Sequence, residues 1–333
     1  MNAAALAEAL RASRGFAHKT DIADVVSALA SYQPAAATTA VAVGDDCAAI
    51  PFNDADGEGY LLFAIEGLVE DFIARMPWFA GYCSVMVNVS DIYAMGGRPL
   101  AVVDALWSKG MDPAAQVLEG MATASQRYGV PIVGGHSNNR AMHGQLAVAI
   151  LGRARRLLTS FNARPGDRLV MAVDLRGAYQ EPYPYWNAST SAPASRLRAD
   201  LELLPELAET GLCDAAKDIS MAGVVGTALM LLECSKVGAR IDIGAVPRPA
   251  EVQTEAELLR WLCAFPSYGF VLSVRPEHTA QVLARFTSRG LACAVIGEVT
   301  ETPEVLLTHE GEHALLWNVA EQTFITAREA LHA

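Results

Sequence analysis

The stretch VNVSDIYAMGGRPLAVVDAL, residues 87–106, carries the strongest structural signal of the chain. An apolar helical pattern over residues 77–95 ends at the glycine pair Gly96–Gly97. The residues that follow the glycines have the pattern of an apolar strand. Within the helix, Asn88 and Asp91 are three residues apart and therefore share one face. The sequence predicts a buried helix that carries an amide and a carboxylate and leads directly into a strand.

Two further strands are predicted upstream of this helix. The segment TTAVAVGDDCAAI, residues 38–50, is apolar and runs into the acids Asp45 and Asp46. The segment YLLFAIEG, residues 60–67, has similar character and reaches Glu66 near its end. We therefore expect each strand to place carboxylates at its C-terminal end.

Downstream of the glycine pair, strands and helices continue to alternate. The strand of residues 98–107 precedes a helix that starts at Asp112–Pro113 and ends near Gly129. Two strands, PIVGG and GQLAVAILGRA, then surround a predicted loop from His136 to His143. This alternation makes the first half an α/β domain.

A polar segment, TSFNARPGDR, separates this half from a second one that opens with the strand RLVMAVD. The second half alternates in the same style and ends with the strands LACAVIGEV and ALLWN. A chain of 333 residues is long for a single core. We expect an α/β (α+β) protein with one domain at residues 1–156 and another at residues 157–333.

The composition limits the classes of function. Hydrophobic residues make up 52% of the chain and charged residues 19%, which predicts a compact, well-packed protein. The formal net charge of −12, without a run of Lys or Arg, argues against nucleic acid as a partner. The first fifteen residues form a short Ala-rich helix pattern rather than a signal peptide, and no apolar stretch reaches the length of a membrane span. We expect a cytoplasmic protein that does not bind membranes.

Several familiar motifs are absent or misleading. The sequence HEGEH, residues 309–313, fits the zinc-protease pattern HExxH, but a glycine lies in its middle and apolar strands flank it. A hairpin turn is the better interpretation, so we reject a zinc site. The chain has no P-loop, no GxGxxG after a strand and no GxSxG. A bound nucleotide therefore needs another kind of cradle.

Five acids lie at the ends of apolar strands or inside apolar segments, where an uncompensated carboxylate costs several kcal/mol. They are Asp45, Asp46, Glu66, Asp91 and Asp218. Any one of them alone is explained by a helix cap or an arginine partner. Together they favour magnesium, which carboxylates, water and phosphates bind jointly, and which supplies charge neutralisation for phosphoryl transfer.

Taken in order, these segments resemble one superfamily, that of aminoimidazole ribonucleotide synthetase, thiamine-monophosphate kinase, selenophosphate synthetase and the hydrogenase maturation dehydratase. VGDDCAAI is similar to its GDDAAV segment, and residues 87–106 are similar to its most distinctive stretch. GVPIVGGHSNN resembles its GGD or GGHS loop, and KDISMAGVVGTALMLLECSKVGARID resembles its Asp-Ile-Ser segment and the helix after it. The resemblance is collinear and spans nearly the whole chain.

The resemblance implies an N-terminal sheet that pairs with that of a second subunit into a barrel, so that the protein is a homodimer, and a C-terminal α/β domain. It also implies ATP bound beside the acidic loops and the glycine segments, with magnesium on the phosphates. In that arrangement Asp45 and Asp46 hold the metal, and Asn88 and Asp91 complete its surroundings. Further implied site residues are Gly44, Glu66, Gly134, Gly135 and Asp218, the last reaching in from the second domain.

Two residues depart from the thiamine-monophosphate kinase pattern. Met221 stands where that kinase has an Asp in DISDG, and His136 stands where it has an Asp after the glycine pair. The N-terminal region also lacks the cysteine or selenocysteine of selenophosphate synthetase. The substrate therefore stays unassigned. We expect phosphoryl activation of a small metabolite, and the alternative is a non-catalytic nucleotide-binding subunit of a partner enzyme.

Two residues and one segment have two interpretations each. By analogy with selenophosphate synthetase, Lys19 contacts the phosphates, and otherwise it is a solvated lysine. His136 acts as an acid or base near neutral pH, or it only fixes the turn after Gly135. The irregular segment from Tyr179 to Trp186 is a surface loop packed on its own aromatic rings, or a lid over the substrate.

Overall fold

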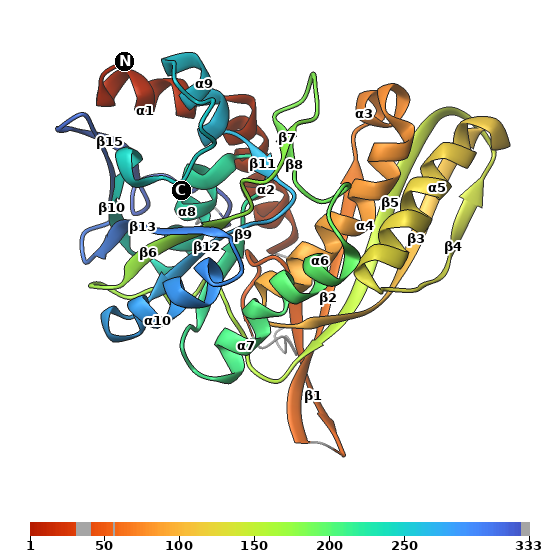
Figure 1. Ribbon diagram of the computed structural model, residues 1–333, viewed down its shortest axis with the longest axis horizontal. Helices are drawn as coiled ribbons and strands as arrows, with labels where there is room; N and C mark the ends of the chain where they lie inside the picture. Colours follow the sequence, from red (N-terminus) through yellow and green to blue (C-terminus); the bar gives the residue numbers. More distant parts are fainter. Residues whose placement is uncertain (31–40, 56, 328–333) are drawn as a thin grey trace. The chain divides into compact units, whose positions relative to one another are not determined.

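The computed structural model describes residues 1–30, 41–55 and 57–327. The chain divides into two compact units (Figure 1). The five-stranded unit comprises Asp46–Leu157 and Ser191–Glu209. The seven-stranded unit comprises Met1–Asp45, Leu158–Thr190 and Thr210–Ala333. Among the described residues, no helix combines the length and the apolar character that a membrane span needs.

The five-stranded unit is built on one mixed sheet with the strand order β1-β2-β5-β3-β4. Only the pairing of β3 with β4 is parallel. Its strands are β1 Ala48–Asp54, β2 Gly57–Leu68, β3 Arg98–Lys109, β4 Ile132–Asn138 and β5 Arg140–Ala154. Its helices are α3 Glu70–Arg75, α4 Pro77–Ala94, α5 Met111–Tyr128, α6 Ala194–Leu201 and α7 Leu203–Glu209.

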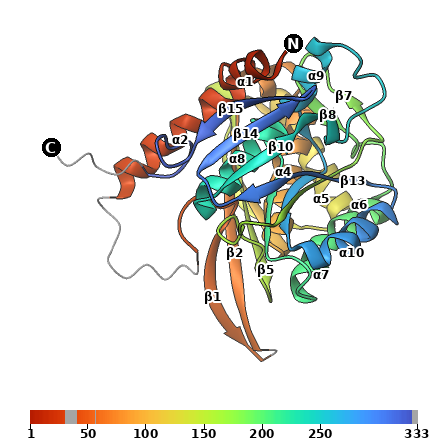
Figure 2. The ribbon, with the colours of Figure 1, turned by 90° about the vertical axis from the view of Figure 1, so that its left-hand side faces the viewer.

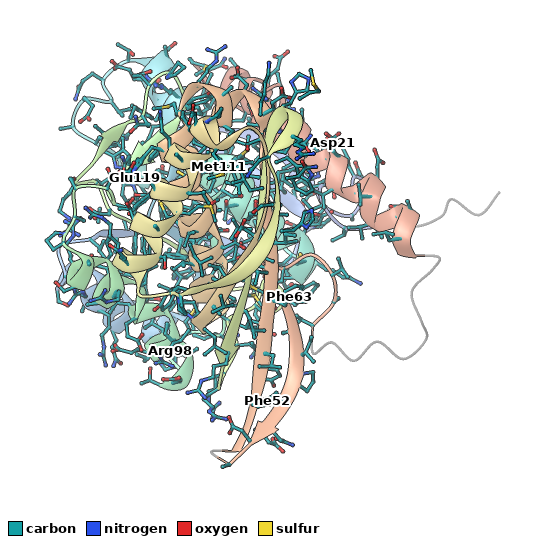
Figure 3. All side chains as sticks on the ribbon, turned by 90° about the vertical axis from the view of Figure 1, so that its right-hand side faces the viewer. Asp21, Phe52, Phe63, Arg98, Met111 and Glu119 are labelled. Atoms are coloured by element: carbon teal, nitrogen blue, oxygen red, sulfur yellow. The ribbon has the colours of Figure 1, made fainter. Side chains whose placement is uncertain are left out.

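The two faces of this sheet differ in what covers them. Alternate residues such as Leu62 and Val148 are buried on the face that packs against α4. A Cβ at Gly152, on the same face, would lie 2.6 Å from the Ile92 side chain of α4. The opposite face keeps large apolar side chains exposed in this chain, and Figure 3 labels one of them, Phe63.

Helices α4 and α5 cross at two glycines that bring their backbones into direct contact. A Cβ built on Gly81 would lie 2.0 Å from the carbonyl oxygen of Val117, and one on Gly120 would lie 1.9 Å from that of Trp78. No real side chain fits at such distances, so only glycine allows this crossing. The crossing fixes the N-terminal halves of both helices beside each other.

The seven-stranded unit contains a sheet of order β15-β14-β10-β13-β6-β12-β9, in which only β10 and β14 pair in parallel, and a small sheet of order β11-β8-β7. The large sheet consists of β6 Arg168–Val173, β9 Ala215–Asp218, β10 Gly238–Asp242, β12 Gly269–Val274, β13 Ala292–Thr300, β14 Glu304–His309 and β15 Glu312–Asn318. The small sheet consists of β7 Ala178–Tyr179, β8 Tyr185–Asn187 and β11 Phe265–Pro266. The helices are α1 Ala3–Arg11, α2 Arg14–Ala30, α8 Gly223–Ser235, α9 Glu255–Leu262, α10 Pro276–Thr287 and the 3-10 turn η1 Ile243–Ala245.

Both ends of the described chain are tied into the seven-stranded unit (Figure 2). Arg11 of α1 donates to the carbonyl oxygen of Leu315 in β15 at 2.9 Å. The buried carboxylate of Glu233 in α8 accepts from the backbone N–H groups of Phe324 at 2.6 Å and Ile325 at 2.8 Å. These bonds satisfy a buried charge with backbone donors, so Glu233 holds the last described segment against the core.

Most of the predicted elements are confirmed. The helix over residues 77–95 is α4, the strand after the glycine pair is β3, and the HEGEH sequence is the β14–β15 turn, with positive φ at Glu310 and Gly311. A mixed α/β, two-domain fold is therefore confirmed.

Two local predictions are wrong. Residues 38–40 of the predicted first strand lie outside the described residues, and residues 41–47 form turns and bends, so that β1 begins after the acids rather than before them. Gly44 has a φ of 135°, which a strand does not accommodate. The segment from His136 to His143 is not a loop either, since β4 and β5 occupy it on both sides of Asn139.

Candidate functional site

Asp46 and Asp91 come together in the five-stranded unit. Asp46 precedes β1 and is half-buried, whereas Asp91 lies on α4 and is buried. Their carboxylate oxygens lie within 4.8 Å of each other. Two carboxylates at this separation repel each other, and a shared cation removes the repulsion. The pair is therefore a candidate divalent-metal site.

Asn88 belongs to the same face of α4, one turn before Asp91. Its side chain is fully buried, and its Nδ2 donates to the carbonyl oxygens of Ser84 at 2.8 Å and Val148 at 3.0 Å. These two bonds fix the amide orientation. Its Oδ1 has no hydrogen-bond partner among the described residues. A buried amide oxygen without a donor is a ready ligand for a cation or an ordered water molecule.

A row of four residues crosses the sheet beneath this helix. The strand registers place Glu66 of β2 opposite Val148 of β5, Val148 opposite Asp104 of β3, and Asp104 opposite Gly135 of β4. Residues opposite each other in a sheet point to the same face. Because Val148 is buried under α4, Glu66 and Asp104 lie on the α4 side of the sheet.

Asp104 is a candidate site residue that the sequence patterns did not single out. A Cβ on Gly135 would lie 2.4 Å from the Asp104 carboxylate, so the glycine makes room for this acid. Burial raises the pKa of Asp104 above its ordinary value. A single acid in an alternating strand is typical of a solvent-facing position, which is why RPLAVVDALW gave no signal. The strand register and Gly135 supply the missing information.

Asp45 points into a different environment, in the seven-stranded unit. Its Oδ2 accepts from the Thr159 hydroxyl at 2.6 Å and from the Ser160 N–H at 2.9 Å, and its Oδ1 accepts from the Ser160 hydroxyl at 2.7 Å. The Lys217 amine lies 4.0 Å away, and the Asp45 side chain is 1% exposed. Both oxygens are thus engaged in fixing the 159–160 turn. The predicted magnesium role of Asp45 stays a prediction.

The remaining predicted residues are distributed over both units. His136 faces away from the α4 side, because it is opposite Ala105 in the register, and its ring centroid is 6.1 Å from that of Trp107. Gly134 is on this uncovered face too, where a Cβ would meet nothing within 4 Å. In the seven-stranded unit, Lys19 is half-buried on α2 and Asp218 ends β9 at 4% exposure. The catalytic, nucleotide and metal roles of these residues stay predictions.

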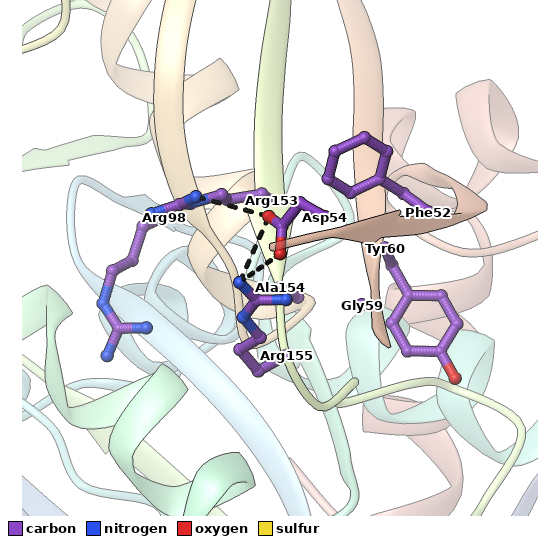
Figure 4. Close-up of a pocket in the computed structure, with 8 residues that line it drawn as sticks. All are labelled: Phe52, Asp54, Gly59, Tyr60, Arg98, Arg153, Ala154 and Arg155. Atoms are coloured by element: carbon purple, nitrogen blue, oxygen red, sulfur yellow. Dashed lines mark hydrogen bonds and ion pairs between the residues drawn. The ribbon is translucent and has the colours of Figure 1, made fainter. Parts of the chain in front are cut away.

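A small cavity of about 80 Å³ lies near the turn end of the β1–β2 hairpin (Figure 4). Asp54 accepts from Arg155 at 2.9 Å and lies 3.9 Å from Arg153. Arg98 lines the same cavity. It donates to Glu202, the residue before α7, at 2.6 Å and to Glu209, the last residue of α7, at 3.0 Å. Each arginine thus has a carboxylate partner, and the cluster ties the hairpin and α7 to the sheet.

Comparison with family models identifies both halves of the chain. A model described as AIR synthase related protein, N-terminal domain, matches residues 44–154. A model described as AIR synthase related protein, C-terminal domain, matches residues 181–310. The two matches follow the order predicted from the sequence motifs.

Individual relatives extend this result. An uncharacterized protein of Synechocystis sp. is 48% identical over 94% of each chain. The thiamine-monophosphate kinase of Pyrococcus horikoshii is 28% identical over 81% of this chain and 86% of its own. Among solved structures, T. maritima PurL complexed with AMPPCP has a TM-score of 0.71 and 21% identity, covering 94% of this chain and 50% of that one. That last likeness shows the fold alone, and this chain spans about half of PurL.

Proposed function

Since the chain belongs to the AIR synthase related protein family, we propose that it is an ATP-dependent enzyme that phosphorylates, or activates by phosphoryl transfer, a small metabolite. The observation that carries the proposal is the Asp46–Asp91 carboxylate pair beside the buried Asn88 amide. A relative named thiamine-monophosphate kinase and a similar fold complexed with AMPPCP support nucleotide chemistry.

The residues present fit magnesium. Asp46 and Asp91 supply two carboxylates within 4.8 Å, and Asn88 supplies an acceptor oxygen that lacks a donor in the described chain. Hard oxygen ligands of this kind suit magnesium. When bound, the metal neutralises phosphate charge during phosphoryl transfer. In this arrangement Asp46 and Asp91 would hold the metal and the Asn88 Oδ1 would accept a hydrogen bond or add a ligand oxygen, while Asp104 and Glu66, on the α4 side of the sheet, would accept a proton or a hydrogen bond.

Binding of ATP is expected to require magnesium, because the bare carboxylates repel a triphosphate. Isothermal titration should show strong ATP binding with magnesium and at least tenfold weaker binding with a chelator, or about 1.4 kcal/mol. ADP release in the presence of candidate metabolites then tests turnover. Equal ATP affinity with and without magnesium would remove the metal from the proposal.

A second candidate function is a nucleotide-binding subunit without catalysis. It is favoured by Met221, where the resemblance to thiamine-monophosphate kinase implies an acid, and by the position of His136 on the sheet face away from α4. Magnesium-dependent ATP binding, with no ADP released in the presence of any metabolite tested, would favour this alternative.

We also propose that the five-stranded sheet pairs with a second copy of the chain. The face away from α4 exposes Phe63 at 49%, Ile65 at 64%, Val103 at 42% and Leu151 at 38%. Phe63 and Leu151 are direct cross-strand neighbours, so the exposed side chains form a continuous patch. A contiguous apolar patch on a sheet marks an interface. The dimer brings two such faces together and removes them from water.

The dimer is expected to depend on this patch. Ile65→Lys should convert the dimer to a monomer at micromolar concentration, because an unpaired ammonium would be buried at its centre. Sedimentation equilibrium measures the change. Leu118→Lys is the matched control, since Leu118 is an exposed residue of α5 at 37% and lies off the sheet. A wild-type protein that is monomeric throughout contradicts the sheet pairing.

A further inference from the structure

A cavity of about 300 Å³ in the five-stranded unit lies where β3 ends and β5 begins. Its walls come from α3, the first turns of α4 and α5, and the strand ends. All of these elements belong to one unit, so the cavity is a property of that unit alone. We propose that this cavity binds a small molecule with a flat aromatic or heteroaromatic ring and one anionic group, a carboxylate or a phosphate. The cavity is separate from the Asp46–Asp91 pair, because Pro77 and Asp91 lie near opposite ends of α4, about 21 Å apart along the helix axis.

The walls are suited to a ring. Ile73, Leu106, Val117 and Met142 contribute aliphatic or thioether surface. A volume of about 300 Å³ matches the lower end of ligand pockets, which bury most of a small molecule. Apolar walls of this size favour a compact ring system over an extended polar chain.

The rim is preorganised by hydrogen bonds. The Ser108 hydroxyl donates to the carbonyl oxygen of Gly110 at 2.7 Å and to Oδ1 of Asn139 at 3.0 Å. The backbone N–H of Gly110 donates to the carbonyl oxygen of Asn139 at 2.9 Å. These bonds tie the end of β3 to the β4–β5 turn, so the cavity keeps its shape without a ligand and little entropy is lost on binding.

The charges at the rim select an anion. Lys109 has no carboxylate within 4.0 Å in the described part of the chain. Glu70 also lines the cavity, and its carboxylate lies 2.9 Å from His143 Nδ1, so the pair carries no net charge when the imidazole is protonated. The N-terminus of α4 enters the wall at Pro77, with no acid in its first turn and no side-chain cap. The α5 N-terminus has Asp112 in its first turn, which offsets its dipole. The remaining uncompensated positive charge is Lys109 together with the α4 dipole.

Phenyl phosphate and 3-phenylpropionate test the proposal, with benzyl alcohol and benzylamine as neutral and cationic counterparts of similar size. The full chain is titrated with each compound, and binding is measured by calorimetry and by tryptophan fluorescence. At least one anion should bind saturably, and benzylamine should bind at least tenfold more weakly. Tighter binding of phenyl phosphate identifies a phosphate as the ligand group, and tighter binding of 3-phenylpropionate identifies a carboxylate. Absence of saturable binding for both anions overturns the proposal, as does equal binding of the amine.

Two variants locate the binding. Ala74→Phe places a ring into the cavity from an exposed position of α3, and should abolish anion binding. Ala115→Phe, at an exposed position of α5 that does not line the cavity, is its matched control. Lys109→Gln should weaken anion binding at least fivefold and leave benzyl alcohol unaffected. Unchanged anion binding in Ala74→Phe places the ligand elsewhere and overturns the assignment.

The same variants separate this inference from the proposed function. Ala74→Phe should keep magnesium-dependent ATP binding, since the Asp46–Asp91 pair is unaltered. If the wild-type chain binds the anionic probes but not magnesium and ATP, the proposed function fails and the cavity stands. If it binds magnesium and ATP but neither probe, the cavity proposal fails alone.

Discussion

Asp46→Asn is expected to weaken magnesium-dependent ATP binding at least tenfold, about 1.4 kcal/mol, while the protein stays folded. The substitution keeps the size of the side chain and removes the charge that Asp46 contributes beside Asp91, whose carboxylate oxygen lies within 4.8 Å. Removing one charge weakens cation binding and relieves the repulsion of Asp91, so the melting temperature should hold or rise. ATP titrations with magnesium and thermal melts on the same purified variant measure both effects.

Asp45→Asn is the matched control, because it makes the same chemical change one residue earlier. Its carboxylate accepts three hydrogen bonds from Thr159 and Ser160. With an amide in its place, the side-chain NH2 group faces the donors of residues 159–160, so a buried group is left without a hydrogen-bond partner, which costs about 1–3 kcal/mol. We expect a lower melting temperature and nearly unchanged ATP affinity for the folded fraction. If Asp46→Asn is destabilised but binds magnesium and ATP normally, the proposed metal site is wrong.

Gly120→Ala should destabilise the protein by more than about 2 kcal/mol, although alanine is the better helix former by about 1 kcal/mol. The new Cβ would lie 1.9 Å from the carbonyl oxygen of Trp78, so α5 has to move away from α4. Chemical denaturation monitored by circular dichroism measures the loss. The cavity beside the two helix N-termini should change shape as well.

Glu119→Ala is the control for this change, since Glu119 is the exposed neighbour of Gly120 on α5 (Figure 3). A surface substitution of this kind should alter the stability by less than about 0.5 kcal/mol. If Gly120→Ala is as stable as wild type, the helices do not depend on the close crossing.

Much of the fold follows from local patterns. The glycine pair that ends α4 and the approximate start of α5 are readable from short stretches of sequence, and the structure has both helices there. The predicted cap at Asp112 is wrong, because Gly110 is the N-cap residue and Asp112 lies in the first turn of α5. The turn around Asp45 could not be found in this way. Its apolar residues resemble a strand, but the conformation depends on Thr159 and Ser160, more than a hundred residues away. Tertiary hydrogen bonds override local propensity at this point.

The candidate site was predictable to the same extent. The spacing of Asn88 and Asp91 on one helix is local, so the sequence reveals it. The placement of Asp104 over Gly135 depends on the register of β3 against β4, and this register cannot be predicted from the local sequence pattern. The face on which His136 lies depends on the bulge between Val102 and Val103 for the same reason.

The bond from Arg11 to Leu315 has a consequence for biosynthesis. These partners are 304 residues apart, so at about 5–20 residues per second the first helix leaves the ribosome roughly 15–60 s before its strand exists. The five-stranded unit is completed earlier, once Glu209 has been made. Helix α1 is thus made before β15 and long before it can pair with that strand, and for that interval the apolar face of α1 depends on other protection from aggregation.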